Sequence, residues 1–330
     1  MSDASIWLIR ILFVAFLAAI PFMVDAYWLN MAILALIYSL VVYSITVLTG
    51  FTGLLSFGQA GFVGLGAYIY GVMSVKGVPP VAAAAWGIVL PTIVGFLLGL
   101  PAARLRGHYM AIGTLGFGVL VAQLLNNMVD VTRGPMGLLG IKSFGLDRVT
   151  WFYCVLALAL VLLAALEYLD RRTFLGVVLK SVKYDEISAS ACGVGVFGVK
   201  LLAFSASAFL AGTCGVLLAA YMKFLTPDLF LSAESFRYLM MAVVGGVGSA
   251  TGALVSTLIL TGVPEALRAF GETNVRLLVY GLMVLFVLWF LPGGIGGLID
   301  RLMAPRRKPR RTSASAPQAP KADTVPGRVS

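Results

Sequence analysis

The sequence predicts an all-α fold, a polytopic bundle of transmembrane helices with roughly eight to ten spans. Among its 330 residues, 60% are Ala, Val, Ile, Leu, Met, Phe, Trp, Tyr or Cys, and only 12% are charged. An ordinary soluble domain carries about 25% charged residues. The mean hydropathy is +0.98. A soluble fold of this length has too little interior for so much apolar surface, whereas a lipid bilayer is itself an apolar solvent.

Apolar runs long enough to cross a bilayer, about 20 residues each, recur along the chain. Eight of them lie at residues 6–24, 29–48, 57–75, 81–100, 109–128, 151–168, 201–221 and 275–291. The first run is expected to be a retained span and not a cleaved signal peptide, because no basic cluster precedes it.

A ninth apolar region, 236–263, is interrupted at residues 245–252 by the run Gly-Gly-Val-Gly-Ser-Ala-Thr-Gly. Lys and Arg favour the cytoplasmic side of a membrane, and they gather at 104–106, at 171–200 and after 300. All three clusters fall on one side only if 236–263 enters the membrane, turns at its glycines and returns. We therefore predict a re-entrant or folded-back segment there and cytoplasmic N- and C-termini.

Irregular backbone at membrane depth is tolerated only where protein or a water-filled cavity satisfies its polar groups. This rule predicts that Gly245, Gly246 and Gly248 lie near a translocation path or in a packed core.

The composition divides the chain into two parts. Residues 1–302 are predicted to form the transmembrane domain, and residues 303–330, rich in Ser, Ala, Pro and basic residues, a disordered cytoplasmic tail. The basic start of the tail either anchors the last span or contacts anionic lipid headgroups. The net charge of +10 does not indicate nucleic-acid binding, because the basic residues cluster at membrane edges.

Several function classes are excluded by missing motifs. The chain has no P-loop motif, so it cannot be its own P-loop ATPase. One His and three Cys, none at a metal-ligand spacing, argue against a metal site or a Ser-His-Asp triad. Asp and Glu are expected at span ends and in loops, which argues against a proton-driven carrier. We therefore predict a transport subunit without catalytic residues, cofactor or metal, energised by a separate ATPase; the alternative is a stand-alone secondary transporter or channel.

A glycine-rich segment at residues 50–68 begins the third span. Its glycines, among them Gly58 and Gly61, allow another backbone or a solute to approach closely. Gln59 offers a donor and an acceptor to a zwitterionic solute. We therefore place these three residues on the translocation path; the alternative for Gln59 is an interhelical hydrogen bond.

This segment closely resembles the signature of the branched-chain amino-acid ABC permeases, specifically their LivM-type subunit. Residues 106–118, 132–138, 174–195, 241–252 and 291–298 are also similar to that family. The resemblance implies a permease of an ABC importer in the bacterial inner membrane, working by ATP-driven alternating access. It implies as partners a second, LivH-like permease, two cytoplasmic ABC ATPase subunits and a periplasmic substrate-binding protein.

The sequence departs from the family at two positions. Val119 stands where the family commonly has an acid, and Arg133 where it has a glycine. These differences leave the solute open between branched-chain amino acids and urea, short amides or aromatic acids.

The hydrophilic loop 174–195 is predicted to contain one amphipathic helix. Leu175, Leu179 and Val182 recur at helical spacing, and Glu186 and Ala189 continue that face. Such a helix suits a groove on a partner, although an ordinary interfacial loop is the alternative.

The end of this loop also carries part of the resemblance. Asp185, Glu186, Ala189 and Gly193 are similar to the family's coupling motif, which implies that they transmit ATPase closure to the spans. Gly193 is expected to take a positive φ and end the helix sharply.

Thr132, Arg133 and Gly134 lie in a predicted periplasmic loop rich in turn-forming residues. The resemblance suggests that this loop meets a substrate-binding protein, with Arg133 pairing with acids on it. A plain turn is the alternative.

Overall fold

The computed structural model describes residues 3–105, 107–266, 281–282, 285–286, 289–290 and 293–303. The predicted tail at 303–330 lies almost entirely outside the described residues, and the predicted span 275–291 only partly within them. The described chain is helical, which confirms the predicted class, apart from a two-residue antiparallel ladder that pairs β1 (Leu138–Leu139) with β2 (Phe224–Leu225).

The elements follow the order of the predicted runs. They are α1 (Asp3–Met23), α2 (Ala26–Ile45), the π-helix η1 (Thr46–Phe51), α3 (Gln59–Val75), α4 (Pro80–Ala102), α5 (His108–Asn127), α6 (Val129–Thr132), the 3₁₀-helix η2 (Gly134–Met136), α7 (Arg148–Arg172), α8 (Phe174–Tyr184), α9 (Glu186–Ala191), α10 (Val196–Met222), the 3₁₀-helix η3 (Pro227–Phe230), α11 (Ser232–Gly245), α12 (Ala250–Ala266) and α14 (Gly294–Met303).

Five helices among the described residues are long and apolar enough to cross a membrane, and three shorter apolar helices accompany them. The five are Ala26–Phe51, Pro80–Ala102, His108–Asn127, Arg148–Arg172 and Val196–Met222. These helices confirm a polytopic bundle, in which the described residues hold five full-length candidates where eight to ten spans were expected for the whole chain. One reason is visible in α3, whose 17 residues reach only about 25 Å at 1.5 Å per residue, short of a hydrocarbon core of about 30 Å.

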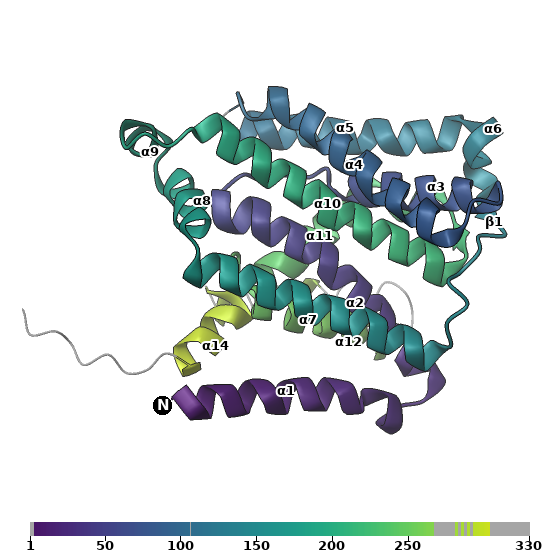
Figure 1. Cartoon of the computed structure of the whole chain (residues 1–330), viewed down its shortest axis with the longest axis horizontal. Coiled ribbons are helices and arrows are strands. Elements are labelled where there is room, and N and C mark those ends of the chain that lie inside the picture. Colours follow the sequence, from purple (N-terminus) through teal and green to yellow (C-terminus); the bar gives the residue numbers. More distant parts are fainter. Residues whose placement is uncertain are drawn as a thin grey trace, which may run out of the picture.

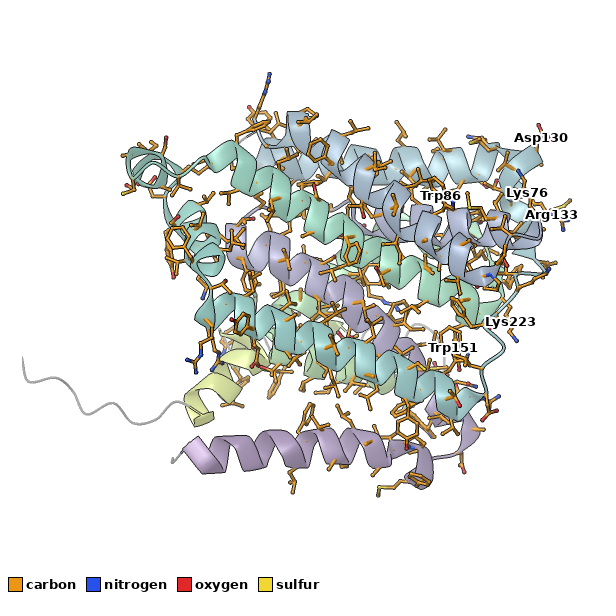
Figure 2. All side chains as sticks on the ribbon, in the orientation of Figure 1. Lys76, Trp86, Asp130, Arg133, Trp151 and Lys223 are labelled. Atoms are coloured by element: carbon orange, nitrogen blue, oxygen red, sulfur yellow. The ribbon has the colours of Figure 1, made fainter. Side chains whose placement is uncertain are left out.

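The long helices lie side by side, and their connections gather at two opposite ends of the bundle (Figure 1). One end, here the α8 end, holds the N-terminus, α8, α9 and α14; the other, the β1 end, holds β1 and α6. Lys76, Arg133 and Lys223 lie at the β1 end (Figure 2). The loop 174–195 and the Thr132–Gly134 turn are therefore on opposite ends.

The core is built where α10 packs against α3, and small residues allow that approach. A Cβ atom at Gly66 would overlap the carbonyl group of Gly212, and one at Gly215 would overlap the carbonyl of Val63. The two backbones therefore touch directly, which explains the glycine content without a separate function for each glycine.

Helices α11 and α12 form a hairpin whose turn lies at the α8 end. The turn contains Gly246 and Gly248, both with positive φ, and a Cβ at Gly50 of η1 would lie 2.7 Å from the Cα of Gly248. At the other end of α12, Tyr27 donates a hydrogen bond to Glu265. Helix α12 thus runs alongside the whole of Ala26–Phe51. This packing does not by itself define a re-entrant course through a membrane.

Candidate functional site

The chain is not helical at residues 53–58, between η1 and α3. Hydroxyl groups satisfy part of this backbone: Thr49 Oγ1 donates to the carbonyl of Leu54 (3.0 Å), and the N–H of Phe57 donates to Thr114 Oγ1 (3.1 Å). Threonine hydroxyls that bond nearby backbone compete with helical bonding, which favours a break here. The side chain of Leu55 is 41% exposed, so it marks the side of the break that the rest of the chain does not cover, here called the open side.

Gly58 and Gly61 bring α3 against α5. A Cβ at Gly58 would lie 2.7 Å from the carbonyl oxygen of Thr114, and one at Gly61 would lie 3.2 Å from the Cα of Gly118. Both glycines therefore serve close helix packing directly beside the break.

Gln59 is buried and joins three helices. Ser44 Oγ of α2 donates to Gln59 Oε1 (3.1 Å), and Gln59 Nε2 donates to Ser207 Oγ of α10 (2.9 Å). With the residue only 1% exposed, this arrangement favours the interhelical hydrogen bond over direct contact with a solute.

A charged pair lies where sequence reasoning expected none. Arg237 Nη1 of α11 is 3.2 Å from Glu234 Oε2, and the guanidinium carbon is 5.3 Å from the centre of the Tyr38 ring. Tyr38 lies at the middle of the 26-residue helix Ala26–Phe51, so the pair is about halfway along the bundle. Glu234 lies at the end of an apolar segment as expected, in the first turn of α11, but that turn is halfway along the bundle and not at one of its two ends. An acid and a base three residues apart just before an apolar run were the available signal, but they also fit an ordinary helix start.

Gly245, Gly246 and Gly248 lie at the α8 end rather than at mid-depth. A Cβ at Gly245 would lie 2.7 Å from the carbonyl oxygen of Gly252, so the first turn of α12 presses on the last turn of α11. Gly246 and Gly248 border a cavity of about 280 Å³ that Gly50 and Lys183 also line.

The loop 174–195 forms two helices, not the single helix predicted. Asp185 has an extended conformation and begins α9: its Oδ1 accepts from the N–H of Ile187 (3.0 Å), and its Oδ2 accepts from the hydroxyl of Ser188. These bonds, that of Ser188 above all, hold the pKa of Asp185 below its ordinary value. Because Asp185 interrupts the helix, Glu186 and Ala189 do not continue the face of α8.

The buried face of α8 also differs from the prediction. Leu179 and Val182 are buried as expected, but Leu175 is exposed and Gly176 takes the inward position. Gly176 is required there because a Cβ would overlap the carbonyl of Leu169.

Both helices are fastened to the bundle by lysines. Lys200 Nζ of α10, in a side chain only 2% exposed, lies 2.6 Å from Glu186 Oε1. Lys183 Nζ of α8 donates to the carbonyl of Gly50 in η1 (2.7 Å). Lys183 thus joins α8 to the helix that leads into the break at 53–58, a link that no sequence pattern indicated.

The prediction for Gly193 is confirmed. It has φ +82°, its N–H donates to Ser190 O (2.9 Å), and the N–H of Val194 donates to Ala189 O (3.1 Å). These two bonds form a Schellman motif. Ala189 is buried, so α9 ends at a defined angle.

At the β1 end, Thr132 is buried and its Oγ1 donates to Leu125 O (2.7 Å). Gly134 has positive φ, and a Cβ there would lie 2.7 Å from Asn126 O. Arg133 is exposed with φ +61°, a conformation that favours glycine. Of the three predicted contact residues, Arg133 alone offers its side chain to a partner.

Broken helices inside a multi-pass bundle are typical of membrane transport proteins. The comparisons narrow this class. Residues 27–288 match the family described as the permease component of branched-chain amino acid transport systems, and the chain belongs to this family of transport subunits. No solved structure matches it.

Relatives of two types are similar to the chain. The high-affinity branched-chain amino acid permease LivM of Escherichia coli is 34% identical, with 86% of this chain and 73% of the relative covered. LivM of Salmonella typhimurium is 33% identical over the same shares. LivH of Salmonella typhimurium is 25% identical, with 79% of this chain and 91% of the relative covered.

Proposed function

We propose that this chain is the LivM-type permease of an ABC importer and that it forms, with a second, LivH-like permease, the path for branched-chain amino acids or related small amino-acid-like solutes. Two cytoplasmic ATPases and a periplasmic binding protein complete the assembly in the bacterial inner membrane. The similarity to LivM supports the assignment. The observation that carries the mechanism is the direct link from α8 to the broken span through Lys183 and Gly50.

The helix pair α8–α9 is the proposed docking site of an ATPase. Its outward residues include Phe174 (80% exposed), Tyr184 (85%) and Ile187 (72%), and apolar side chains gathered on one surface are typical of a protein contact. Asp185 and Gly193 set the start and end of α9, Ala189 packs it, and Glu186 holds it on Lys200. We infer that these four residues keep α9 oriented for the ATPase.

The path is proposed to run along the open side of the break at 53–58. Gly58 and Gly61 let the broken backbone approach α5, and Gln59 supports it from behind. Movement of α8 by an ATPase would be passed through Lys183 to η1 and the break. Gly245, Gly246 and Gly248 border the cavity beside Gly50 and would form the mouth of the path at the α8 end.

This function assigns the α8 end and both termini to the cytoplasm and the β1 end to the periplasm. Helices α11 and α12 are then the folded-back segment, which enters from the periplasmic side and returns there. Arg133, positioned by Thr132 and Gly134, would contact the binding protein. The basic tail, outside the described residues, is proposed to touch lipid.

The alternative of a stand-alone secondary transporter has one supporting observation. Glu234 lies halfway along the bundle, and ion-coupled carriers commonly place an acid at that depth. Reconstitution separates the two functions. Liposomes with the complete complex should accumulate L-leucine only with ATP and binding protein, whereas ATP-independent uptake by this chain alone would replace the importer by the carrier.

A further inference from the structure

We propose that Glu234 and Arg237 form a binding site for zwitterionic α-amino acids halfway along the translocation path. The proposal rests on the function proposed above. It adds the residues that bind the solute and the two charges by which they recognise it.

The first turn of α11 adjoins the broken span at two of its residues. Ser235 Oγ accepts the N–H of Ala60 in the first turn of α3 (2.9 Å). The ring of Phe236 lies 4.8 Å from that of Phe57 in the break. The charged pair Glu234–Arg237 is therefore in the same turn of helix as the contacts that hold the break.

The pair is partly open although it lies halfway along the bundle. The side chains of Arg237 and Glu234 are 37% and 26% exposed. Beside them, Phe236 (41%) and Met240 (43%) form the exposed face of α11. Charged side chains at bilayer mid-depth almost always face the bundle interior or a water-filled cavity, because lipid solvates them poorly. This face of α11 is therefore expected to adjoin the aqueous path and not lipid.

The charges match the two ends of an α-amino acid. A guanidinium binds a carboxylate through paired hydrogen bonds, and the Tyr38 ring beside Arg237 helps to fix its plane. The carboxylate of Glu234 binds an ammonium group. The Phe57–Phe236 ring pair supplies apolar surface next to the charges for an aliphatic side chain. Urea and neutral amides carry neither charge, so the site favours amino acids.

The test uses the complete complex in liposomes with saturating binding protein and radiolabelled L-leucine. ATP-dependent uptake by the wild type tests the proposed function. If the wild type takes up no leucine with ATP, the proposed function is wrong; if only the variants behave differently from expectation, the binding site alone is wrong. Arg237→Gln and Glu234→Gln should each lower leucine uptake at least tenfold, while Lys76→Gln, which removes an exposed cation at the β1 end, should not.

A swapped pair, Glu234→Arg with Arg237→Glu, separates binding from structure. It should restore the thermal unfolding midpoint lost in the single variants but not their uptake. Recovery of uptake together with the midpoint would overturn the proposal, because the pair would then serve only the fold. If the swapped pair does not fold, Arg237→Lys provides the test instead. This variant should raise the apparent KM for leucine at least fivefold and leave the maximal rate unchanged. An unchanged KM would also overturn the proposed site.

Discussion

A buried amide at membrane depth must find partners inside the protein, because lipid offers none. Gln59 illustrates this at the residue scale: its oxygen accepts from Ser44 and its nitrogen donates to Ser207. The side chain therefore ties α2, α3 and α10 together at the first residue of α3. It supports the glycine-rich backbone beside which the proposed path runs.

Gln59→Leu should therefore lower stability and transport together. We expect a loss of about 1–2 kcal/mol, because interhelical hydrogen bonds in membranes contribute about 0.6–1.7 kcal/mol each and Ser44 keeps its bond to Val41. The thermal unfolding midpoint in detergent and uptake per amount of folded complex measure the two effects. Gln123→Leu, which removes an exposed amide from α5, is the control. An unchanged midpoint with lost uptake would place Gln59 on the path instead.

Predictions for single residues succeeded where the local backbone conformation determines the outcome. They failed where the outcome depends on how far along the bundle the residue lies. Gly193 was predictable because a glycine after a short helical pattern is the usual αL stop. Glu234 was not predictable, because its depth depends on η3 (Pro227–Phe230), which brings the chain back into the bundle: Gly64 of α3 packs directly on the Phe230 side chain. Sequence spacing carries no information on such a tertiary contact.

At the scale of elements, α9 is held by an ion pair with unequal burial. Lys200 is 2% exposed and Glu186 is 33% exposed. Removing one partner of a fully buried pair costs about 3–5 kcal/mol; water can partly replace Glu186, so the cost here should be at the lower end. The pair fixes the position of α9 from within the chain, and no sequence pattern indicated Lys200 as the partner of Glu186.

Glu186→Lys should displace α9, because two lysines would then face one another. Co-purification of the ATPase and ATP-dependent uptake are both expected to fall at least fivefold. Adding Lys200→Glu restores an ion pair and should recover most of both activities. If the double variant still failed to bind the ATPase while folded, Glu186 itself would be a contact of the partner.

Lys183 offers a separate test of transmission from α8 to the broken span. Lys183→Met keeps the aliphatic stem that packs beside Gly53 and removes the donor to Gly50. We expect ATPase binding and ATP hydrolysis to persist while leucine transported per ATP falls at least threefold. The matched control is Lys180→Met, another lysine of α8, whose replacement breaks an ion pair with Asp170 of α7. An equal ratio in both variants would remove Lys183 from the coupling route.

The helices themselves were largely readable from hydropathy, and so was the glycine turn between α11 and α12; the exact places of two other breaks were not. The predicted runs 81–100 and 109–128 correspond to Pro80–Ala102 and His108–Asn127. The run 57–75 became a short helix after a break, because Thr49 and Thr114 bond its backbone. The break at Asp185 could not be predicted either, because an acid that caps a helix and an acid on a helix surface cannot be distinguished in sequence until the backbone conformation is known.

At the scale of the whole molecule, the positions of the two ends decide which partners the chain can meet. The α8 end carries the proposed ATPase site, and the β1 end carries Arg133 (Figures 1 and 2). The hairpin α11–α12 brings its glycine turn to the α8 end, where Gly248 meets Gly50. A segment that began and ended at the β1 end yet turned at mid-depth would leave Gly248 far from Gly50.

Cysteine labelling in intact cells tests this arrangement. In a chain with Cys154, Cys192 and Cys214 replaced, single cysteines are introduced at Tyr184 in α8, at Lys142 near β1 and at Val247 in the turn, which are all exposed. A membrane-impermeant thiol reagent added outside should label the Lys142→Cys protein alone. Tyr184→Cys and Val247→Cys should react only after the cytoplasmic face is opened in inverted vesicles, because Val247 shares its end of the bundle with Lys183. Labelling of Val247→Cys from outside would overturn the placement of the turn. Labelling of Tyr184→Cys from outside would invert the whole bundle and move the proposed ATPase site away from the cytoplasm.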